Sequence, residues 1–501
     1  MPRTNSPQFE TYKTVDINFN LAADYRTGDL TVNRDLQIVN MYFDTTSGEN
    51  AKQRLIKLKK RPGLTASSYS LNKVSASDSI RGSFYDPDNN QWYWAVKDKI
   101  YTVKPDSGTS IRTVQTIATT TGYVGFCSYI KNTGERYVIF TDGTTLYYDE
   151  PATSTCTAVT AGYPTPHQPY PLFLDQYVFL IDAGTNDIYN SEVNDINSWS
   201  ASGIISAVIE SDLALRLFKV KNYIICMGTG SIEYFYDAEV DAPASPLKRN
   251  DSPVRGVGYV TGGCQIGDTV YFVGQDKNQN LSVYSVNSFK VDRVSNQVVD
   301  RTLQVFSSTS NAKGNIDLNK DGYSISVDGH NFYVLVTPQT TWVYDIEEKE
   351  WYEWKNSSGS ALAVEAVFGM YNGATYVCVA NQTYLSILSP TVYQDYGVNF
   401  TTRYTTDNLT FDTFNWKIGY RLAVSCSKHL STGISLLSIS YSPDDWSPDG
   451  VVGTTTINVF SNSPMAFRFG KFRNISLRFE YTDNYPFFMD SASFDINVFG
   501  V

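Results

Sequence analysis

A hairpin motif recurs through the middle of the chain at near-constant spacing. Each copy has a tyrosine within a short apolar run, then a turn, then a second aromatic strand. The seven tyrosines are Tyr93, Tyr137, Tyr177, Tyr223, Tyr271, Tyr333 and Tyr376. They lie 44, 40, 46, 48, 62 and 43 residues apart, and a four-stranded propeller blade takes about 40–50 residues. Because each blade needs neighbours to bury its faces, the repeat predicts a β-propeller closed into a disc.

The repeat fits about seven blades, and six to eight remain compatible with it. The apolar strand and its turn are typical of the innermost hairpin of a blade. The interval of 62 residues requires an insertion, which residues 287–311 supply, and a short helix is expected within residues 297–306. The competing fold is another large all-β protein, such as a pair of sandwiches, because hairpins rich in valine and tyrosine occur there too.

The composition also favours an all-β fold, because 36 Tyr and 27 Phe suit the pleated surface of a sheet. A chain of 501 residues exceeds the size of a single core, so modules besides the propeller are expected. We predict an N-terminal arm over residues 1–75 with a strand at 38–43, the propeller over 76–395, and a C-terminal β-sandwich-like domain over 396–501. The alternating runs that predict the sandwich are residues 421–424, 436–441, 467–479 and 494–499. A strand of the arm is a candidate to complete it.

The net charge of −11 argues against a general nucleic-acid binder, because affinity for phosphates comes mainly from lysine and arginine. An acidic wall still suits a conduit, since it repels DNA at close range instead of trapping it. The chain has no apolar window of about 18 residues, and residues 1–10 lack a secretion signal. We therefore expect neither membrane insertion nor export. The six singly scattered cysteines predict free, buried thiols in a protein made in a reducing cytoplasm, with an inter-strand disulfide as the alternative.

Residues that could carry catalysis are sparse. The three histidines, His167, His330 and His429, lie in distant segments without a second ligand at metal-binding spacing. Neither a glycine-rich phosphate loop nor a nucleophile elbow is found in the sequence. We expect His167 and His330 to be structural or exposed. We therefore predict a protein without enzymatic activity and without a cofactor.

Two acidic segments allow other chemistry. Asp444, Asp445 and Asp449 cluster around Trp446, and paired carboxylates can cleave glycans, so a glycan-binding or glycan-cleaving propeller of a tail fibre or spike is the alternative function. Acidic residues among Pro, Ser and Gly are more often turn formers. The second segment, Asp317, Asn319 and Asp321 with Asp328 as the closing carboxylate, matches part of a calcium loop. Its flanks predict a strand instead of a helix, so an ordinary Asn/Asp turn competes with calcium binding.

A run of cations over residues 52–61 precedes a Pro62-Gly63 turn. Lys57, Lys59, Lys60 and Arg61 are the candidate interaction residues, which would dock on an oppositely charged neighbouring subunit. The competing interpretation is a solvated strand edge that lysines protect from aggregation.

Several segments together resemble a known family. They are Val39-Asn40-Met41-Tyr42, Arg61-Pro62-Gly63-Leu64, Ile188-Tyr189-Asn190-Ser191, Asn194-Asp195-Ile196-Asn197-Ser198-Trp199, Gly228-Thr229-Gly230-Ser231-Ile232-Glu233-Tyr234-Phe235, Gly329-His330-Asn331-Phe332-Tyr333-Val334-Leu335, Thr341-Trp342-Val343-Tyr344-Asp345 and Trp351. In this order they resemble the packaged-DNA stabilisation proteins of short-tailed phages, also called tail accessory, hub or nozzle proteins. The resemblance spans roughly residues 39–354, and more faintly residues 468–473 near the end. The chain departs from the family in its longer, Asn-rich segment at 296–321.

This resemblance implies a structural virion protein of the phage tail, made in the host cytoplasm. It implies six copies in a ring below the portal and the head-to-tail adaptor, which extend the DNA channel, help to retain packaged DNA and let it pass on ejection. The implied partners are the adaptor and tail fibre, spike or needle proteins, while DNA passes without sequence-specific binding. A closed propeller would suit this mechanical role, because its sheet edges are short and protected.

Overall fold

The computed structural model describes residues 9–17, 37–47, 54–160, 162–240, 243–308, 322–429, 433–444, 446 and 450–499. The chain divides into two compact units. The propeller unit comprises Ala66–Pro338 and Ala363–Ile387, and the sandwich unit comprises Met1–Thr65, Gln339–Leu362 and Leu388–Val501. Residues 339–362, which lie within the predicted propeller segment, thus cluster with the two ends of the chain. Over the described residues, no helix has the length and apolar character needed to cross a membrane.

Five sheets of the propeller unit are each built from four consecutive antiparallel strands. The first contains β6 (Ile80–Asp86), β7 (Gln91–Val96), β8 (Lys99–Val103) and β9 (Ile111–Thr116), and the second β10 (Gly125–Ile130), β11 (Arg136–Thr141), β12 (Leu146–Glu150) and β13 (Thr155–Ala158). The third contains β14 (Leu172–Leu174), β15 (Tyr177–Ile181), β16 (Asp187–Glu192) and β17 (Asp195–Ser206). The fourth contains β18 (Ala214–Val220), β19 (Tyr223–Gly228), β20 (Ser231–Asp237) and β21 (Leu247–Arg249), with β22 (Val254–Arg255) also paired to β20. The fifth contains β23 (Val257–Ile266), β24 (Thr269–Asp276), β25 (Leu281–Asn287) and β26 (Lys290–Arg293).

The remaining blades use strands from both ends of the propeller segment. After the predicted insertion helix, α1 (Gln297–Ser308), comes the hairpin of β27 (Tyr323–Val327) and β28 (His330–Val336). The last sheet has the order β31 (Val364–Tyr371), β32 (Ala374–Val379), β33 (Tyr384–Ser389) and β5 (Gly63–Ser70). Residues 66–70 of β5 therefore add an N-terminal strand to a blade whose other strands lie about 300 residues later.

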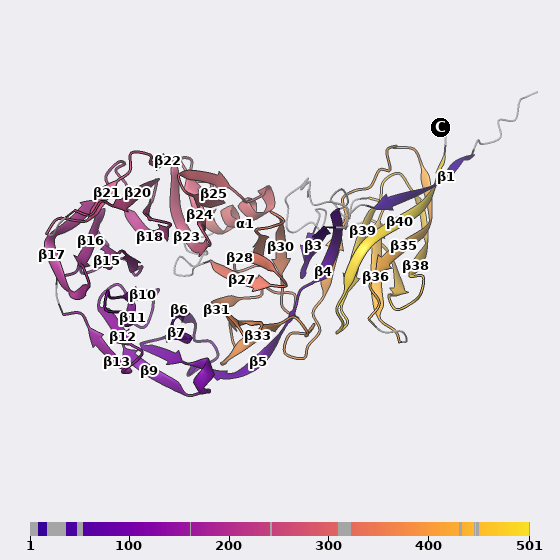
Figure 1. The fold of residues 1–501 in the computed structure, drawn as a ribbon. Coiled ribbons are helices and arrows are strands. Elements are labelled where there is room, and N and C mark those ends of the chain that lie inside the picture. The colour runs from indigo at the N-terminus through magenta and orange to yellow at the C-terminus, as the bar shows by residue number, and fades with distance from the viewer. Residues whose placement is uncertain are drawn as a thin grey trace, which may run out of the picture. The chain divides into compact units, whose positions relative to one another are not determined.

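The blades close into a circle. The first strands β6, β10, β14, β18, β23, β27 and β31 each contact the next around the ring, and β31 contacts β6. Figure 1 shows the sheets arranged radially around these strands. The last blade meets the first at Tyr69 of β5. The ring centroid of Tyr69 lies 5.2 Å from that of Trp92 in the first blade and 6.1 Å from that of Tyr376 in the last. The predicted β-propeller is confirmed, with seven inner strands.

All seven repeat tyrosines lie on the second strand of a sheet, from Tyr93 on β7 to Tyr376 on β32. The prediction that the repeat marks the innermost hairpin is therefore wrong, because it marks the two central strands. The physical reason is burial. A second strand is covered on both faces by neighbouring blades, so β7 is buried along its whole length, whereas the first strands border the hollow centre of the ring.

The sandwich unit contains two sheets. One has the order β3 (Met41–Ser47), β4 (Arg54–Lys60), β40 (Phe488–Phe499), β35 (Lys417–Cys426) and β38 (Met465–Phe472), and β1 (Phe9–Ile17) also pairs with β40. In the other, β29 (Thr341–Asp345) pairs with β30 (Trp351–Trp354), followed by β2 (Gln37–Val39), β34 (Thr402–Thr405), β39 (Ser476–Tyr481), β36 (Leu436–Ser442) and β37 (Gly453–Asn458). Side chains meet between the sheets, as where Tyr441 of β36 packs edge-on against Phe469 of β38 at 5.0 Å. Strands of the N-terminal arm thus complete the C-terminal sandwich.

Two predicted strands are each divided in the structure. The run at 38–43 is broken at Asn40, which has φ 56°, a left-handed conformation that asparagine tolerates better than most residues. The run at 467–479 is two strands, β38 and β39, with a turn between them. All six cysteines are free, and Cys226 and Cys378 are buried while the other four are partly buried.

Candidate functional site

Asn40 and Arg61 end two neighbouring strands of the sandwich unit and meet there. Asn40 lies between β2 and β3, and Arg61 follows β4. Because β3 and β4 form an antiparallel hairpin with Met41 opposite Lys60, the residues at its open end lie side by side. The backbone N–H of Arg61 donates to the carbonyl of Asn40 at 2.9 Å. The fold thus brings together the first two segments of the family resemblance, Val39-Asn40-Met41-Tyr42 and Arg61-Pro62-Gly63-Leu64.

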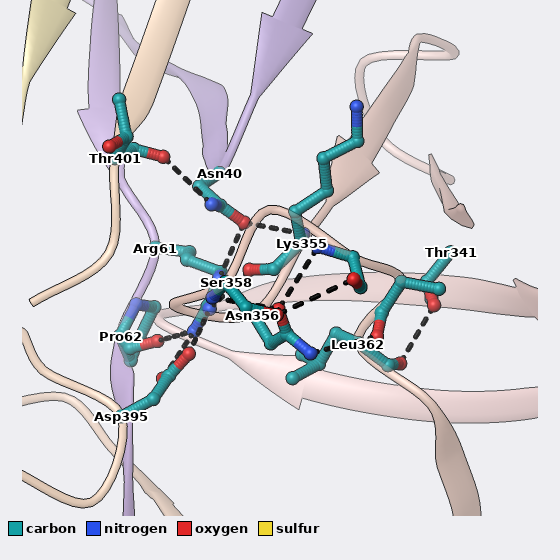
Figure 2. A network of polar contacts seen from close by, with 12 residues as sticks. Asn40, Arg61, Pro62, Thr341, Lys355, Asn356, Ser358, Leu362, Asp395 and Thr401 are labelled. Carbon is teal, nitrogen blue, oxygen red and sulfur yellow. Dashed lines mark hydrogen bonds and ion pairs between the residues drawn. The ribbon is translucent and has the colours of Figure 1, made fainter. Parts of the chain in front are cut away.

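The guanidinium of Arg61 is fully buried and makes five hydrogen bonds (Figure 2). Nη1 and Nη2 donate to the two carboxylate oxygens of Asp395 at 3.0 and 2.6 Å. Nε donates to Oδ1 of Asn40 at 2.9 Å, and the remaining N–H groups reach the carbonyls of Pro62 and Lys355 at 2.9 and 2.8 Å. The ring of Phe400 stacks on the guanidinium at 3.8 Å. A planar fork with five donors matches this set of acceptors, which an ammonium group cannot do.

The side-chain amide of Asn40 forms hydrogen bonds through both its oxygen and its nitrogen. Oδ1 accepts the Arg61 bond and another from the backbone N–H of Lys355 at 2.8 Å, while Nδ2 donates to the carbonyl of Thr401 at 2.8 Å. Its backbone N–H donates to the carbonyl of Glu353. Asn40 and Arg61 therefore join three separate chain segments of the sandwich unit, near residues 40–62, 353–355 and 395–401.

The Pro62-Gly63 turn fits closely against the segment at 392–396. The N–H of Gly63 donates to the carbonyl of Val392 at 2.6 Å, and the N–H of Leu64 to that of Gln394 at 3.0 Å. A Cβ atom on Gly63 would lie 2.1 Å from the carbonyl oxygen of Gln394. This close approach of two backbones requires glycine.

Lys60 is the second fully buried cation of the cluster. Its Nζ donates to the carbonyl of Asp483 at 2.8 Å and lies 4.4 and 5.4 Å from the ring centres of Phe400 and Tyr481. Burial and, second to it, the neighbouring charge of Arg61 lower the pKa of Lys60 to about 7, against an opposing effect of Asp395 and Asp483. Phe400 thus contacts both buried cations.

These contacts correct part of the predicted docking set. Lys60 and Arg61 have no exposed surface in this chain. They stabilise the interior of the sandwich unit, so the prediction that they dock on a neighbouring subunit is wrong for these two residues. Lys59 is partly exposed, 3.7 Å from Asp44 and above the rings of Tyr42 and Phe488, and Lys57 is also partly exposed. A docking role for Lys57 and Lys59 stays a prediction. The alternative of a free strand edge does not hold at residues 58–59, because β4 lies between β3 and β40.

The centre of the propeller is hollowed between the inner strands, with a cavity of about 330 Å³. Arg81 lies on its wall and donates to the carbonyls of Gly122, Thr119 and Thr121 at 2.8, 2.7 and 2.5 Å. Glu365, also on the wall, binds Nζ of Lys73 at 2.8 Å. Arg81 therefore binds the segment between β9 and β10, and Glu365 binds the segment between β5 and β6.

The other predicted residues have structural surroundings. His167 is buried, with Nε2 2.6 Å from Oγ1 of Thr141 and Nδ1 2.9 Å from the carbonyl of Pro164, and burial lowers its pKa. His330 is also buried and stacks on Phe332 at 5.8 Å, and His429 lies 5.8 Å from the ring of Phe488. Asp328 lies in the β27–β28 turn with φ 50°, and Asp317, Asn319 and Asp321 lie outside the described residues.

The segment around Trp446, which suggested glycan binding or cleavage as the alternative function, includes a turn at Asp444. Asp444 accepts hydrogen bonds from the hydroxyl of Ser442 at 2.6 Å and the N–H of Val451 at 3.0 Å. Trp446 is buried, and the guanidinium of Arg478 covers its ring at 4.0 Å. Trp446 thus offers no free face on which a sugar could stack. Asp445 and Asp449 lie outside the described residues.

The sequence analysis did not identify three residues whose side chains contact Arg61. They are Asn40, Asp395 and Phe400. Asp395 and Phe400 follow Arg61 by more than 300 residues and carry no local motif. The available signal was general: an arginine that is buried needs a carboxylate or several carbonyls, but the sequence did not indicate that Arg61 is buried.

One family model matches most of the chain. A family model described as bacteriophage P22 Gp10, β-propeller, matches residues 34–393. No curated protein matches the chain. Among solved structures, streptogramin B lyase has a TM-score of 0.42 and 9% identity, over 65% of this chain and 97% of the other. The N-terminal domain of Nup159 has a TM-score of 0.40 and 11% identity, over 70% and 98%, and an inactive virginiamycin B lyase from Staphylococcus aureus has 0.41 and 10%, over 65% and 98%.

Proposed function

Because this chain belongs to the phage-stabilisation family of bacteriophage P22 Gp10, we propose that it is a ring-forming hub or nozzle subunit of a short-tailed phage. In this role six copies sit below the portal and the head-to-tail adaptor and extend the DNA channel. The ring helps to retain packaged DNA and passes it on ejection.

The observation that carries the proposal is the closure of the propeller. Seven inner strands contact one another in a complete circle, and an N-terminal strand, β5, completes the last blade. A closed ring of blades leaves only short sheet edges and resists deformation without a catalytic machinery. This supports a mechanical task, such as holding a pressurised channel.

The charge of the chain agrees with a conduit. At −11 per copy, a ring is acidic, and an acidic wall repels the phosphates of DNA so that the duplex slides. We propose a non-enzymatic role that needs no cofactor. The proposed partners are the adaptor and a tail fibre, spike or needle protein, and Lys57 and Lys59 are the candidate cations that contact the adaptor.

Mass photometry of the full chain with and without a purified portal–adaptor complex tests the proposal. We expect a mass increase of six copies on the complex. A chain that stays monomeric beside the complex, or that releases sugars from host polysaccharide, contradicts it. Replacing Lys57 and Lys59 by Glu should reduce the bound fraction at least tenfold, while the charge-matched pair Lys277→Glu and Lys290→Glu, both exposed in the fifth blade, should leave it unchanged.

A further inference from the structure

One face of the sandwich unit combines exposed aromatic rings with cations. The face belongs to the sheet of β1, β40, β35 and β38. Its exposed aromatic residues, with the exposed fraction of each, are Tyr12 (61%), Trp416 (42%), Tyr420 (43%) and Phe467 (57%). Single exposed aromatic residues are common, but a group on one sheet face is typical of an interaction site.

Cations surround these rings. Trp416 lies beneath both Lys471 and Arg473, whose charged groups are 4.6 and 4.8 Å from its ring. The pairing of Ile418 with Lys471 and of Lys417 with Phe472 places Lys471 and Arg473 on the outer side, because Lys417 and Phe472 are buried. We call Trp416, Tyr420, Phe467, Lys471 and Arg473 the cation–aromatic face.

The carboxylates of this face do not cancel its charge. Asp495 is almost fully buried, and it accepts hydrogen bonds from Nε of Arg421 at 2.6 Å and Oγ1 of Thr14 at 2.7 Å. Asp16 lies further along β1, beside Ser493. The pair Lys471 and Arg473 therefore remains as an excess of positive charge, on a chain whose net charge is −11.

The propeller unit carries the opposite charge in one sector. Residues 137–215 contain ten aspartates or glutamates and no lysine or arginine. This segment builds most of the second blade and the whole third blade, β14–β17. The two cations that precede this segment are already paired, Arg136 with Asp88 and Lys131 with Glu135 at 3.3 Å.

Two turns gather part of this charge at one end of the third blade. The turn between β14 and β15 carries Asp175, which is exposed, and the turn between β16 and β17 is flanked by Glu192 and Asp195. Asn194 ties the turns together, because its side-chain amide donates to Oε1 of Gln176 at 2.7 Å and its backbone N–H to the carbonyl of Gln176 at 3.1 Å.

An apolar residue lies between Glu192 and Asp195 in the sequence. Val193, on the second turn, is 47% exposed. A further hydrogen bond, from the N–H of Asn132 to Oδ1 of Asn194 at 2.8 Å, fixes the pair of turns to the second blade. We call Asp175, Glu192, Val193 and Asp195 the acidic turns. These hydrogen-bonded turns thus carry an exposed apolar residue and three carboxylates.

We infer that the cation–aromatic face of one copy docks on the acidic turns of the next copy in the ring. The inference rests on the proposed function, because a ring of more than two copies needs two different surfaces that fit each other. Opposite charge steers the two surfaces together and disfavours contact between like surfaces. The exposed Phe467 and Tyr420 supply apolar area for Val193, while Lys471 and Arg473 meet the carboxylates.

A charge-swap experiment with the full chain tests this inference. The first variant carries Lys471→Glu and Arg473→Glu, and the second carries Asp175→Lys, Glu192→Lys and Asp195→Lys. Each variant alone is expected to lose ring assembly on the portal–adaptor complex at least tenfold, as measured by mass photometry. An equimolar mixture is expected to restore it, because each altered surface then meets a partner of opposite charge.

The controls separate this inference from the hub proposal. Lys277→Glu with Lys290→Glu changes the net charge as the first variant does and should assemble normally, and thermal melting checks that every variant is folded. If the wild type forms a ring that neither swap weakens, or the mixture does not restore assembly, the inference is overturned and the hub proposal stands. If the wild type never forms a ring on the complex, both are overturned.

Discussion

Arg61 and Asp395 form a two-point ion pair inside the sandwich unit, with Nη2–Oδ2 and Nη1–Oδ1 distances of 2.6 and 3.0 Å. Neither side chain reaches solvent to any useful extent, since their exposed fractions are 0 and 3%. The pair joins the end of β4 to a segment more than 300 residues later. It therefore ties the N-terminal arm to the C-terminal part of the chain within one unit.

Removing one partner of this pair should destabilise the sandwich unit strongly. Arg61→Ala leaves the Asp395 carboxylate buried without a counter-charge, and breaking a buried pair in this way costs about 3–5 kcal/mol. Arg61→Lys keeps the positive charge but loses the planar guanidinium. It should therefore destabilise the sandwich unit measurably, but less than Arg61→Ala does. Urea unfolding followed by tryptophan fluorescence measures both. A loss below about 1 kcal/mol for Arg61→Ala would count against a structural role.

Gly63 should tolerate no side chain. Gly63→Ala brings a Cβ within 2.1 Å of the Gln394 carbonyl oxygen, so the two backbones must separate and their hydrogen bonds weaken, at a cost of about 2 kcal/mol or more. Gly184→Ala is the matched control, because the nearest atom to its Cβ is a side-chain oxygen of Asp182 at 3.6 Å. Calorimetry should show a lower melting temperature for Gly63→Ala alone. Equal melting of both variants would contradict the close approach.

Lys60 should make the stability of the sandwich unit rise with pH in the alkaline range. Burial lowers the pKa of Lys60 to about 7, whereas an unfolded lysine titrates near its ordinary value of 10.5. Between these values the unfolded chain binds more protons, so the free energy of unfolding rises with pH from about 7 to about 10.5, and Lys60 contributes no slope below that window. Lys60→Met should flatten this dependence. Parallel pH curves for wild type and Lys60→Met, from urea unfolding, would refute the assignment.

Glu350 should act with the opposite sign and in a more acidic window. Burial first, then the charges of Glu348 and Asp345, raise the pKa of Glu350 to about 7. From about pH 4.5 to 7 the folded chain binds more protons than the unfolded one, so the stability falls as pH rises through this window. Glu350→Gln should remove that fall in stability, so the variant should be more stable than the wild type at pH 7.5. NMR titration of the Glu350 carboxyl, with a midpoint near 4.5, would contradict the prediction.

Tyr69 should hold the propeller closed. Its ring packs on Trp92 of the first blade and Tyr376 of the last, and truncation of a large core side chain costs about 3–5 kcal/mol. Tyr69→Ala should raise amide hydrogen exchange in β33 and in residues 66–70, while Ser68→Ala, an exposed neighbour on the same strand, should not. Unchanged exchange in Tyr69→Ala would mean that β5 contributes little to closure.

The propeller was predictable because its repeat reflects burial. A second strand such as that of Tyr333 is apolar along its length, with Phe332 to Leu335 all buried, and that pattern recurs once per blade. The inner strands were not predicted, because they border the central hollow and carry irregularities. The strand β23 shows this, since its pairing shifts register near Thr261 and again before Cys264.

The role of Arg61 was not predictable from its neighbourhood. A run of cations over residues 57–61 is typical of a solvent-exposed surface, and only the tertiary fold brings Asp395 and Phe400 to Arg61. The cation–aromatic face was missed for a related reason. Lys471 lies on β38 and Trp416 immediately precedes β35, so their contact follows from the pairing of β35 with β38.

Retention of packaged DNA tests the central claim most directly. Phage heads that carry the portal and adaptor but lack this protein would be mixed with the purified wild-type chain, with Tyr69→Ala or with buffer alone. Nuclease-accessible DNA would then be measured over time. We expect the wild type to keep the DNA inside the heads and the opened variant to let it leak. DNA that is retained equally well without the protein would contradict the account.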